Sequence, residues 1–159
     1  MSLVTFIGGG KIARAMVSNI IQSRLYKPSQ IIVSDSEEKQ NLYFREKWGI
    51  KTNPNNYEAS LSSNTIILAV KPQSVNVVFK NLENISNKLI LSVIAGIPLK
   101  NYEKNLHNSN NIVRIMPNTP CIIGKGMSVW HGKNLTSSSK LIIENLLKSF
   151  GKELYVDNE

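Results

Sequence analysis

The sequence predicts a doubly wound α/β fold, in which a mostly parallel sheet carries helices on both faces. Short apolar runs of strand length alternate with stretches of helical spacing over the whole 159-residue chain. The apolar runs are continuous, which is typical of strands that are covered on both faces. The first run leads directly into Gly8-Gly9-Gly10, which indicates a tight turn between a strand and a helix.

The strands are predicted from apolar runs that end at turn-forming residues. The run at 65–70 is closed by Lys71-Pro72, and the run at 89–94 is closed by Ala95-Gly96. Shorter runs give a minor third strand and a last strand near the C-terminus. The expected strands are residues 4–7, 31–33, 50–52, 65–70, 89–94, 112–115, 127–130 and 153–156.

The helices are predicted from apolar residues that recur every three or four positions. In the second helix, Leu42 and Phe44 are expected to face the core, and Gly49 is expected to cap the C-terminal end. The serines at 137–139 are interpreted as the N-cap of the last helix. The expected helices are residues 12–23, 37–48, 74–82, 99–106 and 138–150.

Composition limits the classes of protein to consider. The length suits one domain, and no run approaches the roughly 18–20 apolar residues of a membrane span. The N-terminus has no basic segment before its apolar run, so it is read as a strand and not as a signal peptide. The single cysteine, Cys121, cannot form an internal disulfide, which fits the reducing cytoplasm. We therefore expect a cytoplasmic protein without membrane association.

The net charge of +8 favours anionic ligands, such as a dinucleotide phosphate or an acidic metabolite. The lysines are scattered, with no block of five or more and no interleaved aromatics. A solvated lysine-rich surface would give the same pattern. The pattern does not favour nucleic acid as a partner.

The segment from Gly8 to Ala13 matches the dinucleotide fingerprint G-x-G-x-x-A, in the required context of a strand before it and a helix after it. The first glycine allows the sharp turn, the second lets the backbone approach a pyrophosphate, and Ala13 lets the helix pack on the strand. The helix N-terminus then offers N–H groups to phosphates. This pattern predicts a Rossmann-type domain, although a purely structural glycine turn would have the same residues.

The second strand ends at Ser34-Asp35, where an acidic residue usually accepts hydrogen bonds from the ribose of NAD. Asp35 or Ser36 could instead be a helix N-cap. The extra phosphate of NADP would lie near Asp35, and two like charges about 4 Å apart cost roughly 4 kcal/mol at an effective dielectric near 20. Lys39 is the nearest candidate cation in the sequence. NAD(H) is therefore favoured over NADP(H).

Four segments are more specific than the fingerprint. They have the order and spacing found in pyrroline-5-carboxylate reductases, and the chain resembles this family over essentially its whole length. The segments are FIGGGKIA at 6–13, ILAVKPQ at 67–73, LSVIAGI at 91–97 and VRIMPNTP at 113–120.

The resemblance implies a fold in two parts, an N-terminal NAD(P)-binding Rossmann domain and a C-terminal helical domain that forms a dimer. Residues 1–159 would be the first domain alone, with the helical domain missing. The implied activity belongs to proline biosynthesis: a hydride passes from NAD(P)H to the C=N bond of 1-pyrroline-5-carboxylate, or of a similar cyclic imine, giving L-proline. Family members are homo-oligomers, whereas this chain alone is expected to be a monomer or a weak dimer.

The resemblance also assigns residues to the site, with no metal and no assigned catalytic residue. Ile7, Gly8, Gly9, Gly10, Lys11 and Ile12 would lie along the pyrophosphate; Ser34 and Asp35 at the adenosine ribose; Asn56 at a polar cofactor contact; Val70, Lys71 and Pro72 on the nicotinamide side; Ala95 and Gly96 where the ring approaches the backbone; and Asn118 and Thr119 near the substrate.

Several of these residues have a purely structural alternative. Lys71 could be a solvated strand end, and Asn56 could close a turn with Pro54-Asn55. Pro117 and Pro120 could only stiffen a loop. Cys121 is interpreted as a packing residue, and neither His107 nor His131 has a metal-ligand partner at useful spacing.

Two functions follow from the sequence. The chain could be an NAD(P)H-dependent reductase or the cofactor-binding half of one, or it could be a truncated, non-catalytic dinucleotide-binding module or remnant. Because the residues for binding are present and a family member would supply a further wall of the pocket, we expect the chain to bind dinucleotide and to reduce the imine poorly.

Overall fold

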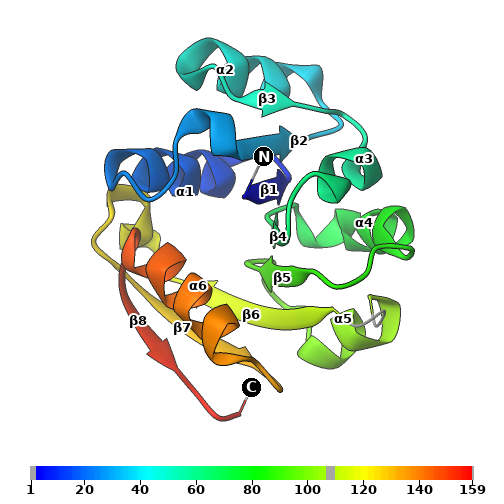
Figure 1. Ribbon diagram of the computed structural model, residues 1–159, viewed down its shortest axis with the longest axis vertical. Coiled ribbons are helices and arrows are strands. Elements are labelled where there is room, and N and C mark those ends of the chain that lie inside the picture. Colours follow the sequence, from blue (N-terminus) through cyan, green and yellow to red (C-terminus); the bar gives the residue numbers. More distant parts are fainter. Residues whose placement is uncertain (1–2, 107–109, 159) are drawn as a thin grey trace.

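A computed structural model describes residues 3–106 and 110–158 of the chain. Its eight strands form one sheet in the order β3-β2-β1-β4-β5-β6-β7-β8 (Figure 1). All neighbouring strands are parallel except β6 and β7, which are antiparallel. The strands are β1 (Val4–Ile7), β2 (Ile31–Ser34), β3 (Lys51–Thr52), β4 (Thr65–Leu68), β5 (Leu89–Ser92), β6 (Asn111–Pro117), β7 (Gly126–Gly132) and β8 (Gly151–Tyr155).

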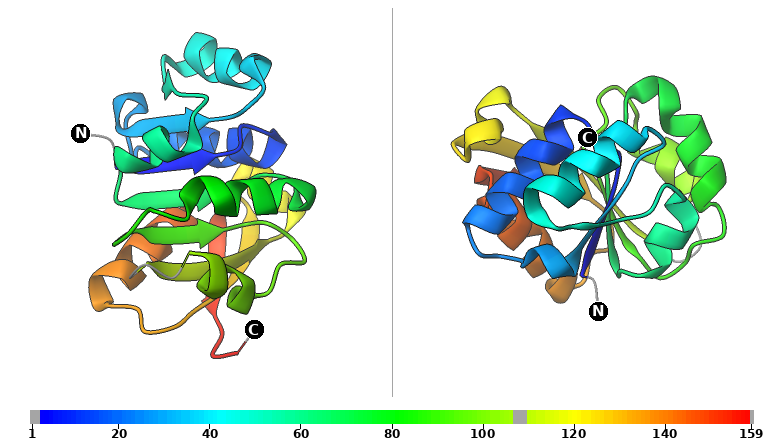
Figure 2. Two further views of the ribbon diagram at one scale, coloured as in Figure 1. Left: turned by 90° about the vertical axis from the view of Figure 1, so that its right-hand side faces the viewer. Right: turned by 90° about the horizontal axis from the view of Figure 1, so that it is seen from above.

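Helices cover both faces of this sheet, as the right-hand view in Figure 2 shows. One core cluster joins β1, β2 and β6 to α1, α2 and α6, and a second joins the opposite strand faces to α4 and α5. The helices are α1 (Lys11–Gln22), α2 (Glu38–Trp48), α3 (Asn56–Leu61), α4 (Val75–Leu82), α5 (Leu99–Asn105) and α6 (Ser137–Lys148), with short 3-10 turns η1 (Pro28–Gln30), η2 (Pro72–Ser74) and η3 (Thr119–Ile123). The predicted doubly wound α/β class is confirmed.

Alternating residues of each strand supply the two cores, which is why the strands are continuous apolar runs. In β1, Phe6 belongs to the cluster beneath α1, and Ile7 belongs to the cluster beneath α4. Both side chains are fully buried. Burial on both faces removes the polar alternation that a one-sided sheet would show.

Two local predictions are wrong, and one is confirmed. Leu42 is 43% exposed, and the fully buried Asn41 takes the inward position beside Phe44. The N-cap of α6 is Thr136, whose hydroxyl accepts the Ser139 N–H at 3.1 Å, so the serines form the first helical turn. The C-cap prediction is confirmed, because Gly49 ends α2 in the left-handed region with φ of 65°.

Helix α3 was not predicted. The turn interpretation of Asn56 is wrong, because Asn56 is the first residue of this helix. The side chain of Asn55 caps it, with Oδ1 accepting the N–H groups of Tyr57 and Glu58. The helix covers β1 through Thr5, whose hydroxyl donates to the Ala59 carbonyl at 3.1 Å.

Among residues 3–106 and 110–158, none of the helices combines the length and the apolar character that crossing a membrane requires.

Candidate functional site

The turn between β1 and α1 lies at the carboxyl edge of the parallel strands, where open α/β sheets bind ligands. Gly8 adopts φ of +102°, and a Cβ atom added there would lie 2.6 Å from the Ala69 carbonyl oxygen. Only glycine accommodates both the conformation and the contact. The turn is therefore pressed against the backbone that follows β4.

Gly10 has the opposite surroundings. It precedes α1 with φ of −70°, and a Cβ atom added there would meet nothing within 4 Å. Glycine has no side chain to cap the helix, and no side-chain cap bonds to the N–H groups of the first turn. A helix N-terminus with room beside it fits a phosphate group, because the exposed N–H groups and the helix dipole both favour an anion. These residues fit a dinucleotide pyrophosphate.

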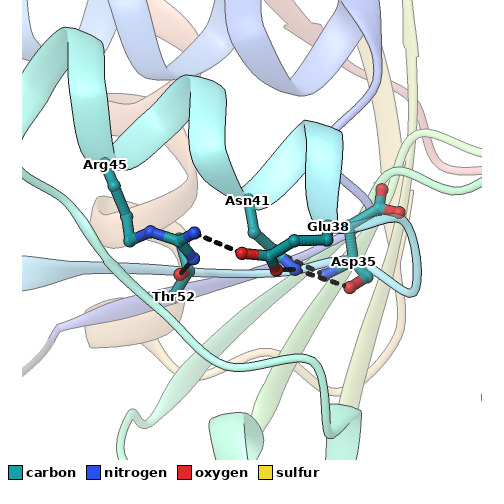
Figure 3. Close-up of polar contacts among 5 residues, drawn as sticks. All are labelled: Asp35, Glu38, Asn41, Arg45 and Thr52. Atoms are coloured by element: carbon teal, nitrogen blue, oxygen red, sulfur yellow. Dashed lines mark hydrogen bonds and ion pairs between the residues drawn. The ribbon is translucent and has the colours of Figure 1, made fainter.

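Asp35 fixes the turn from the side. Its Oδ2 accepts the Gly9 N–H at 2.6 Å, and its Oδ1 accepts the Glu37 N–H at 2.8 Å. The side chain of Asn41 accepts the Asp35 N–H at 3.2 Å and donates to the Asp35 carbonyl at 2.8 Å (Figure 3). The carboxylate thus joins the glycine turn to the start of α2. Each of its oxygens has a further lone pair, so a ligand hydroxyl can still bind.

A second polar contact anchors the outer side of α2. The guanidinium of Arg45 donates to the Glu38 carboxylate and, at 2.8 Å, to the Thr52 hydroxyl (Figure 3). Hydrogen bonding to Arg45 lowers the pKa of Glu38. The contact joins α2 to β3 but is exposed to solvent, so it supports the scaffold and does not enter the cleft.

An open cleft of about 480 Å³ lies beside the glycine turn. Its walls come from the ends of β1, β2 and β4 and from α2, α3 and α4. Asp35 and Glu37 are its acidic residues, and Lys71 is the cation among the lining residues. The cleft is lined by Gly8, Gly10, Ser34, Asp35, Ser36, Glu37, Gln40, Pro54, Asn56, Ala69, Val70, Lys71, Ser74, Val77, Val78 and Asn81.

Seven of the residues assigned to the cofactor are brought together in this cleft: Gly8, Gly10, Ser34, Asp35, Asn56, Val70 and Lys71. Others lie beside it. Ile7 is fully buried in the core, and Gly9 is buried within the turn itself. Lys11 is exposed, Ile12 packs partly on the core, Pro72 begins η2, and Ala95 and Gly96 are exposed after β5.

The two substrate-side candidates do not line this cleft. Asn118 pairs with Met127 instead, because its Oδ1 accepts the Met127 N–H at 2.9 Å and its own N–H donates to the Met127 carbonyl at 3.1 Å. Thr119 is exposed at the start of η3. Pro117 ends β6 and Pro120 lies in η3, so this connection is stiffened by both prolines.

Cys121 and His131 are both buried, which suits structural roles. Cys121 is buried in the core cluster beneath α1, and burial raises the pKa of its thiol. His131 is also buried, with Nδ1 2.8 Å from the Val156 carbonyl oxygen. His107 lies outside the described residues. Within residues 3–106 and 110–158, no group of three or more His, Cys, Asp or Glu side chains is arranged to hold a metal ion.

The sequence did not identify several of the residues that line the cleft. Ser74, Val78 and Asn81 follow one another at intervals of about one helical turn, beginning at the N-cap of α4. This spacing is the sequence signal that could have identified them as residues on one face of the helix. Gln40 was also missed; it accepts a hydrogen bond from Arg14 Nη2 at 2.6 Å, and the Arg14 guanidinium lies 3.7 Å from the centre of the Tyr43 ring. Arg14, and not the exposed Lys39, is the cation attached to the wall around Asp35.

The chain is similar in sequence to known reductases. Pyrroline-5-carboxylate reductases of Haemophilus influenzae and Vibrio alginolyticus are 32% and 33% identical to the chain over 99% and 98% of its length. The chain spans 58% of the length of each of these relatives. The resemblance seen in the sequence is therefore confirmed.

Solved structures show the same relationship. A pyrroline-5-carboxylate reductase from Coxiella burnetii has 30% identity and a TM-score of 0.91, and the match covers 99% of this chain and 60% of that one. The Plasmodium falciparum enzyme, solved with NADP bound, has 24% identity and a TM-score of 0.87, covering 99% and 58%. The family model described as "NADP oxidoreductase coenzyme F420-dependent" matches residues 3–96, which is more than half of the chain. The chain therefore belongs to that oxidoreductase family, and it resembles pyrroline-5-carboxylate reductases.

Proposed function

We propose that the chain binds a nicotinamide dinucleotide in the cleft beside Gly10, as the cofactor-binding domain of a pyrroline-5-carboxylate reductase. The proposed reaction passes a hydride from NAD(P)H to the C=N bond of 1-pyrroline-5-carboxylate and gives L-proline. The observation that carries the proposal is the open space at the start of α1, where Gly10 leaves room for a pyrophosphate.

Three parts of the cleft would hold the ligand. The N–H groups at the start of α1 would bind the pyrophosphate, Ser34 and Asp35 would lie at the adenosine ribose, and Lys71 would lie on the nicotinamide side. When bound, the reduced nicotinamide supplies the hydride. The contribution of the chain is to hold the donor in line with the imine carbon, since a protonated imine is already electrophilic.

The charges of the cleft favour NAD(H) over NADP(H) in this proposal. Asp35 and Glu37 both line the wall near the expected ribose, and a phosphate about 4 Å from one carboxylate would cost roughly 4 kcal/mol at a dielectric near 20. Arg14 lies behind this wall but is already bonded to Gln40 and stacked on Tyr43. We expect NADH to bind at least tenfold more tightly than NADPH. A tenfold preference for NADPH would contradict this assignment.

A second function is a dinucleotide-binding module without catalysis. It is favoured by the absence of Asn118 and Thr119 from the lining of the cleft. We propose that residues 1–159 form a single dinucleotide-binding domain that is a monomer or a weak dimer, which sedimentation would test.

Two measurements separate the functions. A fluorescence titration with NADH and NADPH tests binding, and a steady-state assay of NAD(P)H oxidation with 1-pyrroline-5-carboxylate tests turnover. Binding with turnover of about 1–1000 per second would identify a complete reductase. Binding without turnover would identify the cofactor-binding module. Absence of binding to either dinucleotide would refute both functions and favour a remnant that retains only the fold.

A further inference from the structure

Three polar side chains form a hydrogen-bonded chain along one wall of the cleft. The Ser34 hydroxyl donates to Asn56 Oδ1 at 2.8 Å, and Asn56 Nδ2 donates to Asn81 Oδ1 at 3.1 Å. The three residues come from β2, α3 and α4, and all of them line the cleft. These two hydrogen bonds therefore join the end of β2 to α4 through α3.

These two bonds determine which atoms Asn56 offers to a ligand. An amide side chain has one acceptor oxygen and two N–H donors, and its terminal torsion is roughly two-fold. Ser34 occupies one of the two lone pairs of the oxygen and holds the oxygen toward β2, and Asn81 uses one N–H. No other partner of the Asn56 amide is found in residues 3–106 and 110–158, so its second N–H is available as a donor.

We propose that Asn81 is a positioning residue: it fixes the Asn56 amide so that an N–H, and not the oxygen, faces an oxygen atom of the bound adenosine ribose. This inference rests on the proposed function. The ribose is the expected acceptor because Ser34 directly precedes Asp35 at the end of β2, where the ribose of a bound dinucleotide lies in this fold. Without the Asn81 oxygen, the amide can turn and present its own oxygen to the ribose.

The test is a double-mutant cycle with Asn81→Ala and Asn56→Ala, measured by titration with NADH and with ADP-ribose. Loss of one positioned hydrogen bond corresponds to about a three- to tenfold rise in Kd. We expect Asn81→Ala to raise the Kd of both ligands by this factor, because both contain the adenosine ribose. In the Asn56→Ala background, the same substitution should have no further effect.

Asn76→Ala is the matched control, because Asn76 is exposed on the same helix and does not line the cleft. Alanine is the best helix former, so the helix should persist in each variant, which the Tm verifies. An equal loss from Asn81→Ala in both backgrounds, no loss at all, or a loss confined to NADH would overturn the inference. Failure of the unsubstituted protein to bind NADH and ADP-ribose would instead overturn the proposed function, and the inference with it.

Discussion

Gly8 and Gly10 lie two residues apart, but substituting them should damage different properties. Gly8→Ala should reduce stability, because the added Cβ would lie 2.6 Å from the Ala69 carbonyl oxygen and 2.9 Å from the Val70 nitrogen. Both are backbone atoms and cannot rotate away. Backbone strain costs about 1–3 kcal/mol, and overpacking costs about another 1–3 kcal/mol. The loss is a large part of a total stability of about 5–15 kcal/mol.

Gly10→Val should leave the fold stable and weaken binding. The φ of −70° suits any residue, and no atom lies within 4 Å of the added Cβ. The valine side chain would occupy the space proposed for the pyrophosphate. Losing two hydrogen bonds to a charged group, at about 1.5–3 kcal/mol each, would weaken NADH binding at least about a hundredfold.

Calorimetry and an NADH titration measure both effects on the same samples. Gly8→Ala should lower the Tm by on the order of 10 °C, whereas Gly10→Val should change it by only a few degrees. Gly49→Ala is the matched control for strain, because Gly49 has φ of 65° but no atom within 4 Å of an added Cβ. The reasoning is refuted if Gly10→Val binds NADH normally, or if Gly8→Ala is no less stable than Gly49→Ala.

Three further predictions concern the scaffold. Asn19→Ala removes the buried donor to the Cys121 carbonyl at 2.8 Å, so it should cost about 1–3 kcal/mol and lower the Tm by several degrees; a Tm equal to that of Asn76→Ala would contradict this. Burial raises the pKa of the Cys121 thiol, so a thiol reagent at about pH 8 should react at least about tenfold more slowly with native than with urea-unfolded protein, and equal rates would argue against a buried thiol. Hydrogen bonding to Arg45 lowers the pKa of Glu38, so the contribution of this pair is present above the ordinary value near 4.3 and is lost as the pH falls through the lowered value. The Tm difference between wild type and Glu38→Gln should therefore disappear toward about pH 3, and its persistence there would show that the pair is not responsible.

Local sequence predicted the strands well, because a strand buried on both faces must be a continuous apolar run. Thr65–Leu68 and Leu89–Ser92 were found for this reason, although both end two residues earlier than expected. Helix α3 was missed because it has six residues and only a short buried face, formed by Ala59 and Ser60. Leu42 was wrongly predicted to face the core because the prediction relied on its apolar side chain and not on its position around the helix. The structure instead buries Asn41, whose side chain makes two hydrogen bonds to the Asp35 backbone.

The sequence by itself determined the order of the strands and of every α-helix except α3, the glycine turn and the family resemblance, because each of these is recorded in short stretches of consecutive residues. Only the tertiary structure decided which polar groups meet. Ser34, Asn56 and Asn81 are separated by 22 and 25 residues and come from three elements. Their bonds depend on how the sheet and helices pack, and no periodicity in the sequence encodes the distance between side chains that lie so far apart along it.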